Sequence, residues 1–225
     1  SFRENRWGGL VAQGIGAGDH RQVRETAESS FLGSALLSAA AFVFFLFFSR
    51  PLFQIMGLQS PILEYSTSYI KILSFSLLVL GPVASATAIL QGLGFTKIIM
   101  TAGLVGNVLN ILLDWLLIFG KFGLPAMGLE GAALATVLAN FGAAPMTILF
   151  VLRNPRMPVK LQLRTSLSEQ LKGYGRVLYL GIPSGLEHAL WSVGNLVMVS
   201  FLNRLDMMAA GIYTLVFSIE TVPLL

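Results

Sequence analysis

Long apolar runs constrain this chain more than any other feature of its sequence. The clearest run extends from Ile98 to Phe119 and contains a single charged side chain, Asp114. A helix of about 20 apolar residues spans the hydrocarbon layer of a bilayer, whereas membrane barrels are built from alternating segments of about ten residues. The runs therefore predict an all-α integral membrane protein, a polytopic helical bundle that satisfies its backbone hydrogen bonds within each span.

The composition agrees with this prediction, because 55% of the residues are hydrophobic and only 12% are charged, against about 25% charged residues in soluble domains. The formal charge of +4 is better explained by basic cytoplasmic loops than by a nucleic-acid partner, so we expect no nucleic acid. With no cysteine and two histidines, the chain offers no disulfide framework, thiolate metal site or histidine metal site. We also expect no cofactor and no enzymatic activity, because the sequence shows no cluster of catalytic groups.

The apolar runs place successive spans along the chain. Arg50-Pro51 is expected to end the first span, and Pro82 is expected to kink the second. The fourth span is rich in Ala and Gly, which lets helix backbones approach closely, so we expect it in the interior of the bundle. Residues 20–29 are polar and are expected to form a solvated face. The spans cover residues 30–48, 68–90, 98–119, 129–152 and 174–202, and another begins near Met207.

Lys and Arg residues alternate between the two sides of this bundle. Nine lie on one side and three on the other, so the positive-inside rule assigns the first side to the cytoplasm. This bias predicts a multi-pass protein of the plasma membrane, surrounded by the lipid bilayer, with the polar connection 153–173 in the cytoplasm. The nine are Arg21, Arg24, Lys97, Arg153, Arg156, Lys160, Arg164, Lys172 and Arg176, and the three are Arg50, Lys121 and Arg204.

Both ends of the sequence look cut. Ser1 is not an initiator, and no apolar segment follows Arg3 and Arg6 as it would in a signal peptide. The last residues stop inside an apolar run. We therefore expect a piece of a longer protein, and one reading is that the piece has no activity by itself.

Asp114 is the first candidate for a functional site. Asn107 and Asn110 precede it by seven and four residues, so the three side chains share one face of a helix. An ionised Asp at a bilayer centre costs about 2.5–3.5 kcal/mol, so it normally faces a cavity or a partner. The alternative is a structural ion pair, but spans 98–119 and 129–152 contain no Lys or Arg to form one.

Residues 91–140 carry a specific resemblance. QGLGFTK, followed by NVLNILLDWLLIFGKFGLPAMGLEGAALAT, resembles the multidrug and toxic compound extrusion (MATE) family at its fifth and sixth helices. VAQGIGAGDHRQ resembles the end of that family's second helix. GIPSGLEHALWSVGNLVMVSFLNRL resembles the start of its seventh. The resemblance thus extends over nearly the whole chain.

The resemblance implies part of a twelve-helix architecture made of two six-helix lobes. Residues 1–152 would belong to the N-terminal lobe, from the end of helix two to helix six. Residues 153–173 would be the cytoplasmic linker, and residues 174–225 the start of the C-terminal lobe, with helix seven and part of helix eight. Members of the family export organic cations and other amphipathic small molecules in exchange for Na⁺ or H⁺. The resemblance therefore implies a monomeric antiporter for multidrug efflux in the bacterial inner membrane.

Asn110, Asp114 and Thr136 match members of the family's first-lobe cation site. Burial in a low-dielectric cavity disfavours an ionised carboxylate, which can then take up a proton or bind Na⁺. Asn110 and Thr136 could complete such a site with hard oxygen ligands. We expect no metal other than this possible Na⁺ at Asp114. The family's acidic residue in helix one, which completes the site, lies outside this sequence.

Glu187 and Glu220 are additional intramembrane acidic candidates. Some members of the family place a functional Glu in helix seven, eight residues after a proline. Here that position is Trp191, and Glu187 follows Pro183 by only four residues, so the role is not transferred. The neighbouring His188 points to a different helical face and is expected to be a hydrogen-bonded bundle residue.

Two further function classes compete with an exporter. A lipid-linked oligosaccharide flippase of the same superfamily would share the two-lobe architecture, but its polyanionic cargo calls for several Lys or Arg within the spans. Only Lys71 and Arg176 lie within the spans, each near one end of its span. An integral-membrane enzyme would need a cluster of catalytic groups near a membrane face. Cationic or neutral cargo and ion-coupled efflux are therefore the favoured prediction.

Overall fold

The computed structural model describes residues 20–55, 59–154, 182–183, 185–195, 197–198, 201–202, 213 and 216. The chain divides into two compact units. One is Trp7–Tyr174, and the other consists of Ser1–Arg6 and Gly175–Leu225. Every regular element among the described residues is a helix. The predicted all-α class is therefore confirmed.

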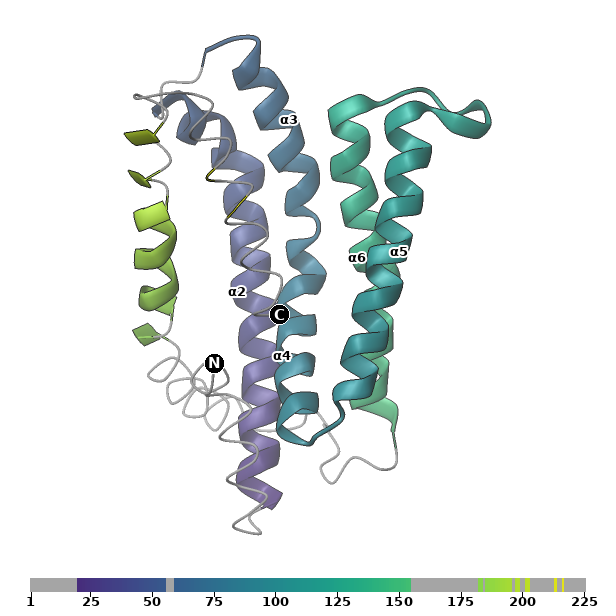
Figure 1. Ribbon diagram of the computed structural model, residues 1–225. Coiled ribbons are helices and arrows are strands. Elements are labelled where there is room, and N and C mark those ends of the chain that lie inside the picture. The colour runs from purple at the N-terminus through teal and green to yellow at the C-terminus, as the bar shows by residue number, and fades with distance from the viewer. Residues whose placement is uncertain are drawn as a thin grey trace. The chain divides into compact units, whose positions relative to one another are not determined.

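The unit Trp7–Tyr174 is a bundle of long helices that lie side by side (Figure 1). Three of its described helical segments are long and apolar enough to cross a membrane, namely Ala27–Ile55, Thr96–Phe119 and Gly128–Arg153, and a bent pair of helices forms a fourth candidate. The elements are α2 (His20–Ile55), α3 (Ile62–Ser74), α4 (Leu77–Gly92), α5 (Thr96–Phe119), the short 3-10 helix η1 (Lys121–Gly123) and α6 (Gly128–Arg153).

Helix α2 is longer at both ends than the predicted span 30–48. Arg50-Pro51 does not end it, because the helix continues through Pro51 to Ile55. A proline removes one backbone donor, and near the last turns of a helix that loss leaves the rest of the hydrogen-bond ladder intact. Residues 27–29 are buried and not a solvated face, since Ala27 belongs to a buried cluster with Leu90 and Val151.

The predicted span 68–90 is two helices, α3 and α4, bent by 47°. The bend lies between Ser74 and Leu77, so the prediction that Pro82 makes the kink is wrong. At the bend the N–H groups of Phe75 and Ser76 donate to carbonyls three residues back, at 3.1 and 2.9 Å. These tighter turns break the α-helical ladder.

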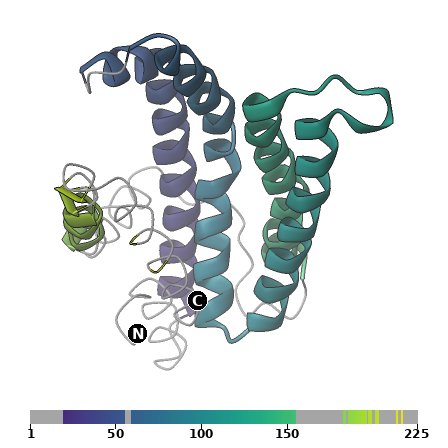
Figure 2. The ribbon, with the colours of Figure 1, turned by 45° about the horizontal axis from the view of Figure 1, so that its top comes forward.

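Helices α5 and α6 agree with the predicted spans 98–119 and 129–152, and they run antiparallel as a pair (Figure 2). Gly120 ends α5 in the left-handed conformation, with φ of 63°, and its N–H bonds to the carbonyl of Leu116. Helix α6 also packs against α3 and α4. In the most apolar stretch of 18 residues, 33% of the residues of α6 are buried, against 11% in α5. This greater burial confirms the predicted position of α6 in the interior of the bundle.

The helix backbones approach each other closely at two crossings, one between α5 and α6 and the other between α2 and α4. A Cβ atom on Gly131 of α6 would lie 2.8 Å from the carbonyl oxygen of Leu117 in α5. A Cβ atom on Gly81 of α4 would overlap the side chain of Ser38 and the backbone of Ser34 in α2. Small residues at such crossings are the usual basis of helix association in membranes.

Candidate functional site

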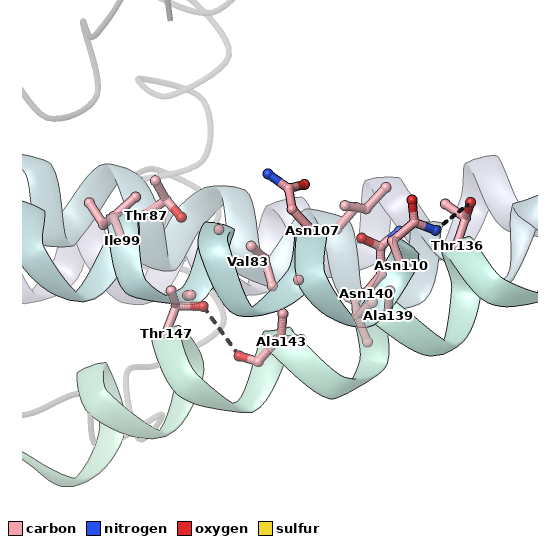
Figure 3. A pocket seen from close by; sticks show the side chains of 16 residues that line it. Val83, Thr87, Ile99, Asn107, Asn110, Thr136, Ala139, Asn140, Ala143 and Thr147 are labelled. Carbon is pink, nitrogen blue, oxygen red and sulfur yellow. Dashed lines mark hydrogen bonds between the residues drawn. The ribbon is translucent and has the colours of Figure 1, made fainter. Parts of the chain in front are cut away.

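A cavity of about 370 Å³ lies between α4, α5 and α6. Its polar lining consists of three asparagines and three threonines, and the rest of its lining is apolar or glycine. None of the lining residues is charged. The polar residues are Thr87 of α4, Asn107 and Asn110 of α5, and Thr136, Asn140 and Thr147 of α6 (Figure 3).

The spacing of these residues explains why they share one cavity. Thr136, Asn140 and Thr147 recur at intervals of four and seven residues along α6, so they lie on one face of that helix. Asn110 and Thr136 stand at one end of the cavity, and Thr87 and Thr147 stand at the other (Figure 3).

The structure brings together two of the three predicted cation-site residues. The Asn110 Nδ2 donates to Thr136 Oγ1 at 3.4 Å, which links α5 to α6. The Thr136 hydroxyl in turn donates to the carbonyl of Ala132 at 3.0 Å. The side-chain oxygen of Asn110 has no hydrogen-bond partner among the described residues, so a hard oxygen ligand remains available.

Asp114 lies one helical turn beyond Asn110, toward the end of α5, and is not part of the cavity lining. Its Oδ1 is buried and has no hydrogen-bond partner among the described residues. Nor does any described Lys or Arg pair with it, in contrast to Glu64, which Arg50 contacts at 2.8 Å. A buried carboxylate oxygen without a partner is rare in folded proteins and marks Asp114 as a candidate functional residue.

The other predicted acidic candidates lie elsewhere in the chain. Glu187 and the neighbouring His188 are exposed on described helical residues of the unit that contains Gly175–Leu225. Glu220 lies outside the described residues, as do the linker from residue 155 onward and most of the predicted last span.

Asn140 is the cavity residue that the sequence reasoning missed. The sequence contained a signal for it. Asn140 follows Thr136 by four residues in a span of Ala, Val, Leu and Phe, so the two side chains should lie on the same face of the helix. Thr87 and Thr147 were missed in the same way. Threonine hydroxyls in helices often bond to their own backbone, so sequence alone could not show that these two face a cavity.

Comparisons with known proteins identify relatives of this chain. The MatE family model matches residues 8–116. A probable multidrug resistance protein NorM from Thermotoga maritima is 33% identical over 85% of this chain and 41% of its own length. The multidrug resistance protein NorM of Vibrio vulnificus is 27% identical over 77% of this chain and 38% of its own length. The chain thus spans about two fifths of the length of these relatives.

Solved structures show the same fold. A crystal structure of a MATE point mutant superposes with a TM-score of 0.83, at 24% identity, over 96% of this chain and 48% of that one. An inward-facing multidrug resistance MATE family transporter superposes with a TM-score of 0.70, at 26% identity, over 80% of this chain and 40% of that one. The matching family model and these relatives support the assignment of this chain to the multidrug and toxic compound extrusion family, and the solved structures agree with its fold.

Proposed function

We propose that this chain forms part of an antiporter that exports organic cations, drugs and other amphipathic compounds in exchange for Na⁺ or H⁺. The observation that carries the proposal is the buried, unpartnered Oδ1 of Asp114, one helical turn from the contact between Asn110 and Thr136. That contact lies on the wall of the cavity between α4, α5 and α6. The names of the relatives, which describe multidrug resistance, support the same activity.

A proton or Na⁺ would neutralise Asp114 in the membrane interior. Sodium would take oxygen ligands from Asp114, Asn110 and Thr136, whereas a proton needs only the carboxylate. Either ion offsets the cost of a charge in a low-dielectric site. Exchange follows when ion and cargo favour states that open to opposite sides of the membrane.

The uncharged cavity lining favours cationic or neutral cargo over the polyanionic cargo of a flippase. A lipid-linked oligosaccharide carries phosphates, which proteins bind with Arg and Lys. No Arg or Lys lines this cavity. We propose that the protein works as a monomeric transporter, and not as an enzyme, in the bacterial inner membrane.

Efflux by the full-length protein tests the proposal. Reconstituted vesicles would be loaded with a fluorescent organic cation, and an inward Na⁺ gradient or an inward H⁺ gradient would be imposed in separate runs. We expect one gradient to drive efflux, and Asp114→Asn to lower that ion-driven rate about tenfold or more, because Asn keeps the shape but carries no titratable charge.

Glu130→Gln is the matched control, because Glu130 is an exposed carboxylate in the first turn of α6. It should leave the rate within about twofold, as expected for a screened surface charge. Ion-driven efflux that is unchanged in Asp114→Asn would contradict the proposed role of Asp114. Absence of efflux by the wild-type protein under both gradients would contradict the antiport itself.

A further inference from the structure

Three of the six polar residues in the cavity wall already make hydrogen bonds within the protein. The hydroxyls of Thr136 and Thr147 donate to the carbonyls of Ala132 and Ala144, at 3.0 and 3.2 Å. Asn110 donates to Thr136. The lining asparagines that make no hydrogen bond with described residues are Asn107 and Asn140.

Asn140 is the better placed of these two asparagines to meet a bound molecule. It is half-buried on the inner face of α6, between the buried residues Ala139 and Ala144, whereas Asn107 is exposed. Figure 3 shows its side chain in the interval between α6 and α5, near the end of the cavity where Asn110 and Thr136 lie. When a bound molecule displaces water from such a carboxamide, the lost hydrogen bonds are regained only if that molecule supplies partners.

Apolar side chains also line the cavity near Asn140 (Figure 3). Val83 of α4 and Ala139 and Ala143 of α6 belong to this lining and offer only van der Waals contact. A flat aromatic molecule can bury its faces against such side chains while its edge meets the carboxamide. The carboxamide has one acceptor oxygen and two N–H donors.

We propose, on the basis of the exporter function above, that Asn140 is a specificity-determining residue that selects aromatic cations carrying primary amino groups. Its side-chain oxygen accepts a hydrogen bond from an amino N–H of the cargo. An analogue with the same ring system and charge, but with fully alkylated amino groups, leaves Asn140 desolvated and unpaired. Sites built to hydrogen-bond a cargo group discriminate strongly against analogues that lack the group.

Proflavine and acridine orange form a matched pair of probes. Both are acridine cations, and acridine orange differs by having methyl groups in place of the amino hydrogens. In vesicles containing the full-length protein, the ratio of proflavine to acridine orange transport, as kcat/KM, would be measured for the wild type and for Asn140→Leu. We expect the ratio to fall about five- to thirtyfold, as loss of one or two net hydrogen bonds predicts.

Two further variants distinguish the loss of the Asn140 carboxamide from a general effect of substitution on folding. Asn140→Gln retains the carboxamide and should keep the ratio within about threefold of wild type. Leu138→Met, at an exposed position on α6 outside the cavity lining, should leave both rates unchanged. Acridine orange transport by Asn140→Leu serves as the internal measure of folded protein.

The outcomes separate this inference from the exporter function. Wild-type transport of both dyes with a ratio that Asn140→Leu does not change would overturn the role of Asn140 and leave the exporter intact. A loss of transport in Asn140→Leu that is equal for both dyes would overturn it too. Wild-type protein that moves neither dye under either ion gradient would overturn the exporter function and this inference together.

Discussion

The hydroxyl of Thr136 serves two helices, because it accepts a hydrogen bond from Asn110 of α5 and donates one to Ala132 of its own helix. Replacing Thr by the isosteric Val removes this oxygen and leaves the Asn110 amide without an acceptor. If the oxygen also binds the coupling ion, its loss weakens ion binding by roughly one hydrogen bond, about 1 kcal/mol.

We therefore expect Thr136→Val to raise the Na⁺ concentration, or the H⁺ activity, for half-maximal efflux about fivefold. Thr136→Ser keeps the oxygen and should stay within about twofold of wild type. The measurement is the dependence of efflux rate on the coupling ion in vesicles of full-length protein. Identical ion dependence in Thr136→Val and wild type would exclude Thr136 from the ion site.

At the level of elements, α5 and α6 approach each other closely at Gly131. Gly131→Ala would place a methyl group 2.8 Å from the backbone oxygen of Leu117, and a backbone atom cannot move aside as a side chain can. Gly103→Ala is the matched control, since nothing lies within 4 Å of its Cβ position in α5.

We expect Gly131→Ala to lower the free energy of unfolding by about 1–3 kcal/mol through overpacking. Gly103→Ala should be neutral or stabilising by up to about 1 kcal/mol, because alanine is the better helix former. Thermal unfolding of the full-length protein in detergent measures both. Equal stability of the two variants would show that the close α5–α6 contact contributes little.

For the molecule as a whole, the orientation in the membrane follows from which ends of α5 and α6 carry Lys or Arg. Lys97 begins α5 and Arg153 ends α6, and the rings of Phe95 and Phe150 lie 5.5 Å apart at that same end. Lys121 lies at the opposite end of the pair. The positive-inside rule assigns the Lys97 and Arg153 end to the cytoplasm.

Single cysteines test this orientation, since the sequence contains none. In a full-length protein without other cysteines, a membrane-impermeant maleimide should label Lys121→Cys on intact cells. Arg153→Cys should react only after the membrane is permeabilised. Both positions are exposed in the structure, so burial does not explain a difference in labelling. The reverse labelling pattern would invert the topology.

The sequence by itself determined the fold class, the two spans α5 and α6, and the candidate pair Asn110 and Asp114. These depend on information local to a helix: the length of an apolar run, a turn rich in glycine, and residues four apart on one face. The resemblance to a known family added Thr136, which lies 26 residues from Asn110 in the chain and is joined to it by a hydrogen bond.

Only the tertiary structure decided where α2 ends, where the bent pair α3 and α4 breaks, and which polar residues meet in the cavity. Whether Pro51 ends a helix or stays within it, and whether the bend occurs at Ser74–Leu77 or at Pro82, depends on the neighbours that pack there. Asn140 gained its position because α6 packs against both α4 and α5. Such packing joins residues far apart in sequence, and the local pattern of a single helix does not encode it.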